Sequence, residues 1–158
     1  MDAIIMPSML SLISKLQKDF PTIKFETGKR FSWSPERDTV FYDETDADNL
    51  LLLLHELSHG VLGHKSYQKD VQLLSMEATA WDKALELAKQ YDVTPDQDAA
   101  QDNLDTYRDW LHARSTCPQC QATGFQKTKN TYECVACSHI WRVNEARLCA
   151  LRRYSITK

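Results

Sequence analysis

Residues 50–64 read LLLLLHELSHGVLGH, and this stretch decides the fold of the chain. Five leucines precede His55, Glu56 and His59, and Gly63 then offers a natural helix stop. Residues four apart on a helix lie on one face, one turn apart, so both imidazoles can reach a single ion. The leucines would fix this helix in an apolar core. We therefore predict a core helix that carries a metal-binding pair of histidines.

The order His-Glu-x-x-His is typical of zinc peptidases. Zinc lowers the pKa of its bound water towards ~7, and Glu56 is placed to accept that proton as hydroxide attacks a scissile carbonyl. The alternative interpretation is a chance match on an amphipathic helix. The leucine run before the motif, and the sheet and long helix predicted on either side of it, favour the catalytic interpretation.

A catalytic zinc site takes three protein ligands and keeps one position open. Glu77 is the best third ligand, because it lies 18 residues after His59 on a helix that a short turn could fold back. A solvent-facing glutamate is the simpler alternative. His64 and Asp82 are rival ligands, although His64 fits better as a helix-end cap or a pocket residue. An oxyanion donor could come from His64 or from one of three further residues: Tyr67, Tyr107 and His112.

Two stretches resemble the ImmA/IrrE family of metallopeptidases, HELSHGVLGH at 55–64 and MEATA at 76–80. Proteins of this family share an H-E-x-x-H helix, often continued as L-G-H, and a downstream helix that supplies a glutamate ligand. The resemblance covers roughly residues 20–92 and implies a zincin-like domain. Carried over by position, the zinc ligands would be His55, His59 and Glu77, and the general base would be Glu56. The helix-turn-helix DNA-binding domain of many relatives is not found in this sequence.

The remaining elements are read from periodicity and turn residues. We expect a helix over 8–20, with Leu10, Ile13, Leu16 and Phe20 at helical spacing, and a small antiparallel sheet from residues 23–27, 31–33 and 39–42. In the family, the counterpart of 34–42 is a strand that borders the substrate cleft. Further helices are expected from a Thr45 cap to Leu62, from Tyr67 to Tyr91, and from Thr94-Pro95 to His112. The fold class is therefore α+β, with a zincin-like domain at 1–114.

Residues 115–158 change in character, and we predict a separate module there. Two C-x-x-C units, at Cys117/Cys120 and Cys134/Cys137, are separated by 13 residues. Each unit offers two thiolates, and the two together complete a tetrahedral four-cysteine zinc site on a hairpin, a zinc ribbon. A disulfide or redox pair is the alternative. With all four positions filled by sulfur, this second zinc ion should be structural. Cys149 is interpreted as a buried apolar residue.

Charge is unevenly distributed along the chain. Residues 115–158 carry seven Lys/Arg against two acids, whereas residues 1–114 carry twelve against twenty. The basic and aromatic residues of the ribbon could bind single-stranded nucleic acid, form a solvated surface, or dock on a protein. They are Phe125, Lys127, Lys129, Tyr132, Trp141, Arg142, Arg147, Arg152 and Arg153.

The sequence contains no membrane span and no signal peptide, so we expect a cytoplasmic protein. The leading function is a zinc-dependent endopeptidase that hydrolyses a cytoplasmic protein or peptide substrate. A SprT-like protease, which joins an H-E-x-x-H domain to a zinc ribbon and acts on DNA-bound proteins, is the second possibility. A non-catalytic zinc-ribbon binding module is the third. Whether Glu77 or a histidine completes the first site separates the two protease readings.

Overall fold

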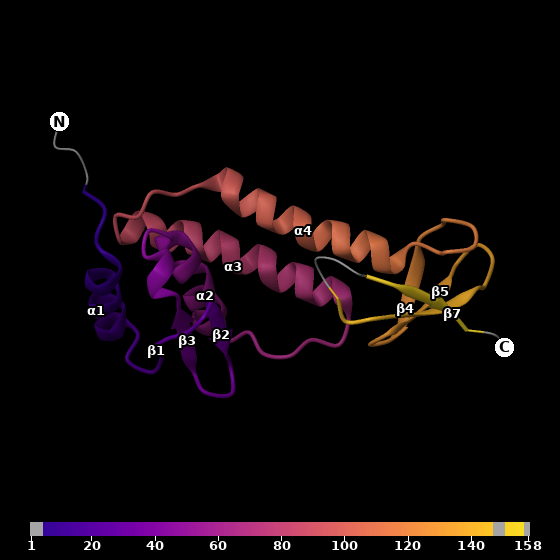
Figure 1. Ribbon diagram of the computed structural model, residues 1–158, viewed down its shortest axis with the longest axis horizontal. Helices are drawn as coiled ribbons and strands as arrows, with labels where there is room; N and C mark the ends of the chain where they lie inside the picture. The colour runs from indigo at the N-terminus through magenta and orange to yellow at the C-terminus, as the bar shows by residue number, and fades with distance from the viewer. Residues whose placement is uncertain (1–4, 147–150, 157–158) are drawn as a thin grey trace. The chain divides into compact units, whose positions relative to one another are not determined.

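The computed structural model describes residues 5–146 and 151–156, and it has the α+β class expected from the sequence. Figure 1 traces the elements along the chain. The helices are α1 (Met9–Asp19), the 3-10 helix η1 (Glu44–Asp46), α2 (Leu50–Val61), α3 (Asp70–Gln90) and α4 (Gln97–Ser115). The strands are β1 (Lys24–Thr27), β2 (Ser32–Ser34), β3 (Thr39–Tyr42), β4 (Gly124–Thr128), β5 (Thr131–Cys134), β6 (Ile140–Val143) and β7 (Arg153–Ser155).

The chain divides into two compact units. The first comprises residues up to Lys65 together with Ala78–Asp98, and the second comprises Ser66–Glu77 together with residues from Ala99 onward. The seam falls between Glu77 and Ala78, inside the uninterrupted helix α3. These units do not coincide with the division at residue 115 predicted from composition, because the second unit also includes most of α4 and the beginning of α3.

Helix α1 begins where the sequence places it, but its buried face is rotated from the predicted one. The Ser8 hydroxyl accepts a hydrogen bond from the Ser11 backbone N–H at 3.1 Å, which caps the helix. The buried residues of α1 are Met9, Leu12, Ile13 and Leu16. Leu10, one of the residues noted at helical spacing, is 65% exposed and lies off the buried face. Both stripes satisfy helical spacing and share Ile13 and Leu16, and the observed one contains Met9 and Leu12 in place of Leu10 and Phe20.

The first sheet has the order β1-β3-β2 and is mixed rather than antiparallel. Strands β2 and β3 pair antiparallel, as predicted, whereas β1 runs parallel to β3 with Phe25 opposite Val40. Strand β3 is the most buried of the three, and Val40 is fully buried. The most apolar strand thus takes the centre, which separates β1 from β2 and makes one of the two pairings parallel.

Helix α2 begins at Leu50 rather than after a Thr45 cap. The Asp43 carboxylate accepts hydrogen bonds from the Thr45 backbone N–H at 2.9 Å and from the Thr45 hydroxyl at 2.6 Å. Thr45 is therefore held inside η1 and does not cap the helix. Asn49 caps α2 instead, with its side-chain oxygen accepting from the Leu52 backbone N–H at 3.3 Å.

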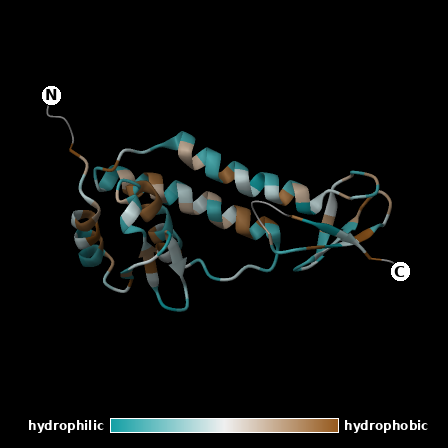
Figure 2. Cartoon of the chain, in the orientation of Figure 1, coloured by the Kyte–Doolittle hydropathy of each residue, from teal (hydrophilic) through white to brown (hydrophobic). Residues whose placement is uncertain are grey.

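The leucine run buries α2 against the first sheet. Leu53, Leu54 and Leu57 are fully buried, and the helix packs on β2 and β3. Figure 2 shows hydrophobic colour gathered on α1 and α2. At the end of the helix, a Cβ on Gly60 would lie 2.8 Å from the Trp33 ring, so the indole occupies space that only glycine leaves open.

Helices α3 and α4 are shorter at their starts than predicted. Helix α3 begins at Asp70 rather than Tyr67, and α4 begins at Gln97 rather than at Thr94-Pro95. The Thr94 hydroxyl donates to the Met6 sulfur at 3.1 Å, which draws it away from a capping role. The apolar face of α3 is buried at Leu73, Ala80, Ala84, Leu87 and Ala88, while Leu74 is partly exposed. Within the described residues, no helix has the length and apolarity needed to span a membrane.

The second sheet is antiparallel throughout, in the order β4-β5-β6-β7. Four residues of the sheet, Tyr132, Cys134, Trp141 and Val143, form a small core together with Cys117. A Cβ on Gly124 would lie 2.5 Å from the Trp141 ring and 2.7 Å from the Glu133 carbonyl oxygen, so β4 starts on a residue that has to be glycine. Cys149, predicted to be a buried apolar residue, and Arg147 lie outside the described residues.

A buried ion pair holds this sheet within the second unit. Asp70 and Arg114 are each 1% exposed, and Arg114 Nε donates to Asp70 Oδ2 at 2.7 Å. The Tyr132 hydroxyl donates to the same carboxylate oxygen. Arg114 also donates to the carbonyl oxygens of Asn144 and Lys129. One side chain of α4 is thereby bonded both to the start of α3 and to two loops of the ribbon.

Candidate metal centres

His55 and His59 lie one turn apart on α2, with both rings buried. The two Nε2 atoms face each other at 3.2 Å. Two nitrogens bound tetrahedrally to one zinc ion at ~2.0–2.1 Å would be about 3.3 Å apart. The ring nitrogens are therefore already at the spacing that a shared ion requires.

Glu77 joins this histidine pair from α3. One ligand atom from each of His55, His59 and Glu77 lies within 4.8 Å of the other two, and all three residues are buried. The Trp81 ring, one turn after Glu77, stacks on the His55 ring with centroids 4.1 Å apart. Because residues four apart share a helix face, this stacking directs Glu77 towards the histidines. The predicted ligand set thus converges, and the grouping could hold a metal ion.

Glu56 follows His55 on α2 and is partly exposed, whereas the histidines on either side of it are buried. Of the rival ligands, Asp82 is exposed and lines a separate surface hollow with residues 94–98. Tyr67, Tyr107 and His112, named as oxyanion donors, belong to the second compact unit. Neither Asp82 nor these three residues is in the His-His-Glu group.

His64 lies on the opposite side of the His59 ring from His55. Its Nδ1 is 2.9 Å from His59 Nδ1, and its Nε2 is 3.4 Å from the Thr79 hydroxyl oxygen. The Trp33 indole N–H donates to the His64 carbonyl oxygen at 3.1 Å. Sequence reasoning named His64 but missed Trp33, Thr79 and Trp81. The signal for Trp81 was available, since it stands one turn after Glu77 on the same helix face.

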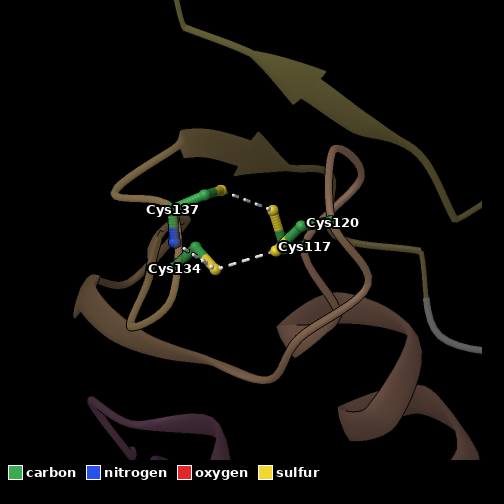
Figure 3. A group of neighbouring side chains, drawn as sticks. All are labelled: Cys117, Cys120, Cys134 and Cys137. Atoms are coloured by element: carbon green, nitrogen blue, oxygen red, sulfur yellow. Dashed lines mark hydrogen bonds between the residues drawn. The ribbon is translucent and has the colours of Figure 1, made fainter.

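The four cysteines form the second cluster, and their side chains point towards a common centre (Figure 3). Cys117 Sγ lies 3.7 Å from Cys137 Sγ, and Cys120 Sγ lies 3.4 Å from Cys134 Sγ. Sulfurs bound tetrahedrally to zinc at ~2.3 Å would be about 3.8 Å apart, whereas a disulfide requires ~2.05 Å. All four are free cysteines. The separations match a metal site and exclude disulfides in this structure.

The two C-x-x-C turns have the same local geometry. The residue that follows each second cysteine has a positive φ, 65° at Gln121 and 63° at Ser138. Backbone N–H groups point at the sulfur of each first cysteine, at 3.4 Å from Gln119 to Cys117 and 3.3 Å from Ala136 to Cys134. Each turn thus orients its thiolates with main-chain donors.

These donors also favour the thiolate form that binds metals. The backbone N–H of Cys137, assisted by that of Ala136, outweighs burial and lowers the pKa of the Cys134 thiol to about 6. Cys134 is therefore largely ionised at neutral pH. The ribbon accordingly presents at least one ready thiolate ligand.

The described part of the chain has two candidate metal sites, one of two histidines and a glutamate and one of four cysteines, which is consistent with two bound ions. No protein-family model matches the chain, and neither the curated proteins nor the solved structures contain a significant match.

Proposed function

We propose that this protein is a zinc-dependent endopeptidase that hydrolyses peptide bonds of a protein substrate. The observation that carries the proposal is the convergence of His55, His59 and Glu77 beside Glu56. Two imidazoles and one carboxylate are a ligand set of catalytic zinc, because they leave a fourth position open. The resemblance of residues 55–64 and 76–80 to ImmA/IrrE metallopeptidases supports the same reaction.

Each residue then has a defined task. A bound zinc ion supplies Lewis acidity, which polarises a peptide carbonyl and acidifies a water molecule. His55, His59 and Glu77 hold the metal through buried donor atoms. Glu56 accepts the proton of the attacking water and returns it to the amide nitrogen that leaves. The partly exposed position of Glu56 suits a group that exchanges protons with water and substrate.

The nature of the third ligand separates two protease classes. A SprT-like protease would complete its site with a histidine from a later segment. His64 contacts the outer nitrogen of His59, and His112 is not in the metal-binding group, whereas Glu77 groups with the histidine pair. These positions favour the ImmA/IrrE-like alternative. A non-catalytic binding module is disfavoured, because the residues needed for hydrolysis are all retained.

The direct test combines metal counting with substitution. Purified protein should contain two zinc ions per chain. Glu56→Gln should keep both ions and lose at least ~100-fold of peptidase activity, since it removes the general base. Glu77→Ala should lose one ion, while Glu86→Ala, an exposed position on the same helix, should keep both ions and full activity. Capture of proteins by the Glu56→Gln variant in cells would then identify the substrate.

Two outcomes would overturn the proposal. If Glu56→Gln retained wild-type peptidase activity, the proposed base would be wrong. If Glu77→Ala retained both ions, the third ligand would lie elsewhere, and a SprT-like protease or a non-catalytic binding module would be favoured.

The outer face of the ribbon sheet supports a second activity, binding of single-stranded nucleic acid. Tyr132 and Trp141 point into the core, so by strand alternation the outer face carries Phe125, Arg142 and Tyr154. Phe125 is 48% exposed and Tyr154 is 40% exposed. The Arg142 guanidinium lies over the Tyr154 ring at 4.9 Å. Exposed rings beside cations are what base stacking and phosphate contact require.

This second activity is tested with the same purified protein. A labelled single-stranded oligonucleotide should bind with an affinity that falls as salt rises. Replacing Phe125 and Arg142 together by Ala should weaken binding, whereas replacing Lys15 and Lys18 on α1 should not. Equal binding by both double variants would assign the ribbon face to another role.

A further inference from the structure

We infer that His64 is a positioning residue that holds His59 in the tautomer and ring orientation required for metal binding. The inference rests on the proposed metal site, and it concerns a side chain outside the ligand set. Its basis is a continuous series of contacts from His55 Nε2 through the rings of His59 and His64 to the Thr79 hydroxyl. Every member belongs to the first compact unit.

The chain is folded back to bring His64 to this position. Gly63 has a φ of +70°, a conformation open to glycine, and it reverses the chain at the end of α2. The His64 backbone N–H then donates to the His59 carbonyl oxygen at 2.9 Å. The Trp33 indole N–H fixes the His64 carbonyl oxygen. Both backbone polar groups of His64 are thereby held, which directs its ring towards His59.

Metal binding determines the protons along this series. A histidine that gives the Nε2 lone pair to a metal carries its proton on Nδ1. His59 Nδ1–H must then donate, and His64 Nδ1, at 2.9 Å, must accept. A neutral His64 that accepts at Nδ1 carries its own proton on Nε2, which faces the Thr79 hydroxyl oxygen. One proton arrangement satisfies both hydrogen bonds of His64, and in it the unprotonated Nε2 of His59 can bind the ion.

The same geometry separates positioning from ligation. His64 contacts Nδ1 of His59, the ring nitrogen that is turned away from His55. His64 is therefore a neighbour of a ligand and is not itself a ligand of the ion. Metal-bound histidines generally donate their second N–H to an acceptor that fixes the ring, and loss of that acceptor weakens metal binding by roughly 10–100-fold. Here a neutral imidazole serves where a carboxylate or a carbonyl is more usual.

The test compares two substitutions at one position. His64→Leu removes the acceptor at similar size, whereas His64→Asn can place an amide oxygen close to the Nδ1 position. Zinc affinity of the first site is measured by competition with graded chelators, and the four-cysteine site provides an internal reference in each sample. We expect His64→Leu to weaken the first site about 10-fold or more and His64→Asn to restore most of the affinity.

A spectroscopic signal supplies an independent readout. In the zinc-loaded wild type, the His59 Nδ1 proton should give a slowly exchanging imidazole N–H resonance, which should persist in His64→Asn and disappear in His64→Leu. Thr79→Val, which keeps the side-chain shape, should weaken zinc binding less than His64→Leu does. This milder variant also keeps the test valid if His64→Leu is poorly folded.

Unchanged zinc affinity in His64→Leu, or equally weak binding in His64→Leu and His64→Asn, would overturn the inference. If the wild-type protein bound no zinc at the first site, both the proposed function and this inference would be wrong. The zinc content of the wild type therefore distinguishes the two failures.

Discussion

The two candidate metal sites among the described residues are built in opposite ways. The ligands of the first cluster come from two helices, and α2 is held by fully buried leucines that need no ion. The ligands of the second come from two turns beside a core of five residues, two of which are themselves ligands. An ion in the first site is added to a formed scaffold, whereas an ion in the second replaces part of a core. This difference supports the proposed catalytic role of the first site and the predicted structural role of the second.

The largest contrast should appear when each site is broken in turn. Cys134→Ser should leave β4–β6 without a defined fold, because structural zinc contributes roughly 10–16 kcal/mol of apparent binding energy in small zinc-dependent modules. His59→Ala should lose the other ion and keep both sheets. Nuclear magnetic resonance spectra would show the result in the signals of Tyr132 and Trp141. If both residues gave native signals in Cys134→Ser, the ribbon would fold without its ion, and the predicted difference between the two sites would be wrong.

The next effect concerns the buried ion pair that accompanies the ribbon. Arg114→Ala should lower the free energy of unfolding by about 3–5 kcal/mol, because it leaves the Asp70 carboxylate buried without its cation. Denaturant unfolding measures the loss. Arg108→Ala is the matched control on the same helix, since its pair with Asp105 is exposed and should contribute less than about 1 kcal/mol. Similar losses for the two variants would show that the ribbon does not depend on this pair.

The stability of α2 should depend on its buried leucines and not on a bound metal ion. Leu54→Ala should cost about 3 kcal/mol, since the side chain is fully buried in α2. Leu62→Ala, at a 42% exposed position, should change stability by less than about 0.5 kcal/mol. Both values are best measured with and without chelator. A Leu54→Ala loss that vanished in chelator would mean that the ion, not the core, organises this helix.

The smallest effect separates the hydroxyl of Tyr132 from its ring. Tyr132→Phe keeps the core and removes one hydrogen bond to Asp70, at a cost of about 1.5 kcal/mol. Burial, and then the hydrogen bond to Asp70, raise the pKa of Tyr132 above its usual 10.0. The folded state holds this proton more tightly, so the contribution is complete below pH 10 and is lost as pH rises further. The difference in unfolding free energy between wild type and variant should therefore shrink above pH 10.

Local patterns in the sequence predicted some features well and others poorly. Helix i, i+4 spacing anticipated the facing rings of His55 and His59, and the paired C-x-x-C units anticipated the four-cysteine cluster. The start of α2 was predicted wrongly. Thr45 has a side chain that can cap a helix, but its hydroxyl donates to the Asp43 carboxylate instead. The parallel pairing of β1 was also missed, since strand order depends on which strand is most deeply buried and not on local alternation.

The surroundings of the first site were the least predictable part. Trp33 and Thr79 reach His64 from β2 and from α3, and no spacing rule connects residues 31 and 15 positions apart. Trp81 is different, because its helical distance from Glu77 pointed to the same face. Neighbours on one helix can thus be read from a single sequence, whereas contacts between elements require the tertiary structure.

The fit of Trp33 over Gly60 has a consequence for recognising relatives of this chain. Any side chain at position 60 would displace the indole, and with it the donor that holds the His64 carbonyl. Position 60 and position 33 should therefore vary together across evolution: a large aromatic residue paired with glycine, or neither. A sequence search that asks for H-E-x-x-H-G with a tryptophan some 22 residues before the first histidine would select chains that share this arrangement, where the bare metal motif would not.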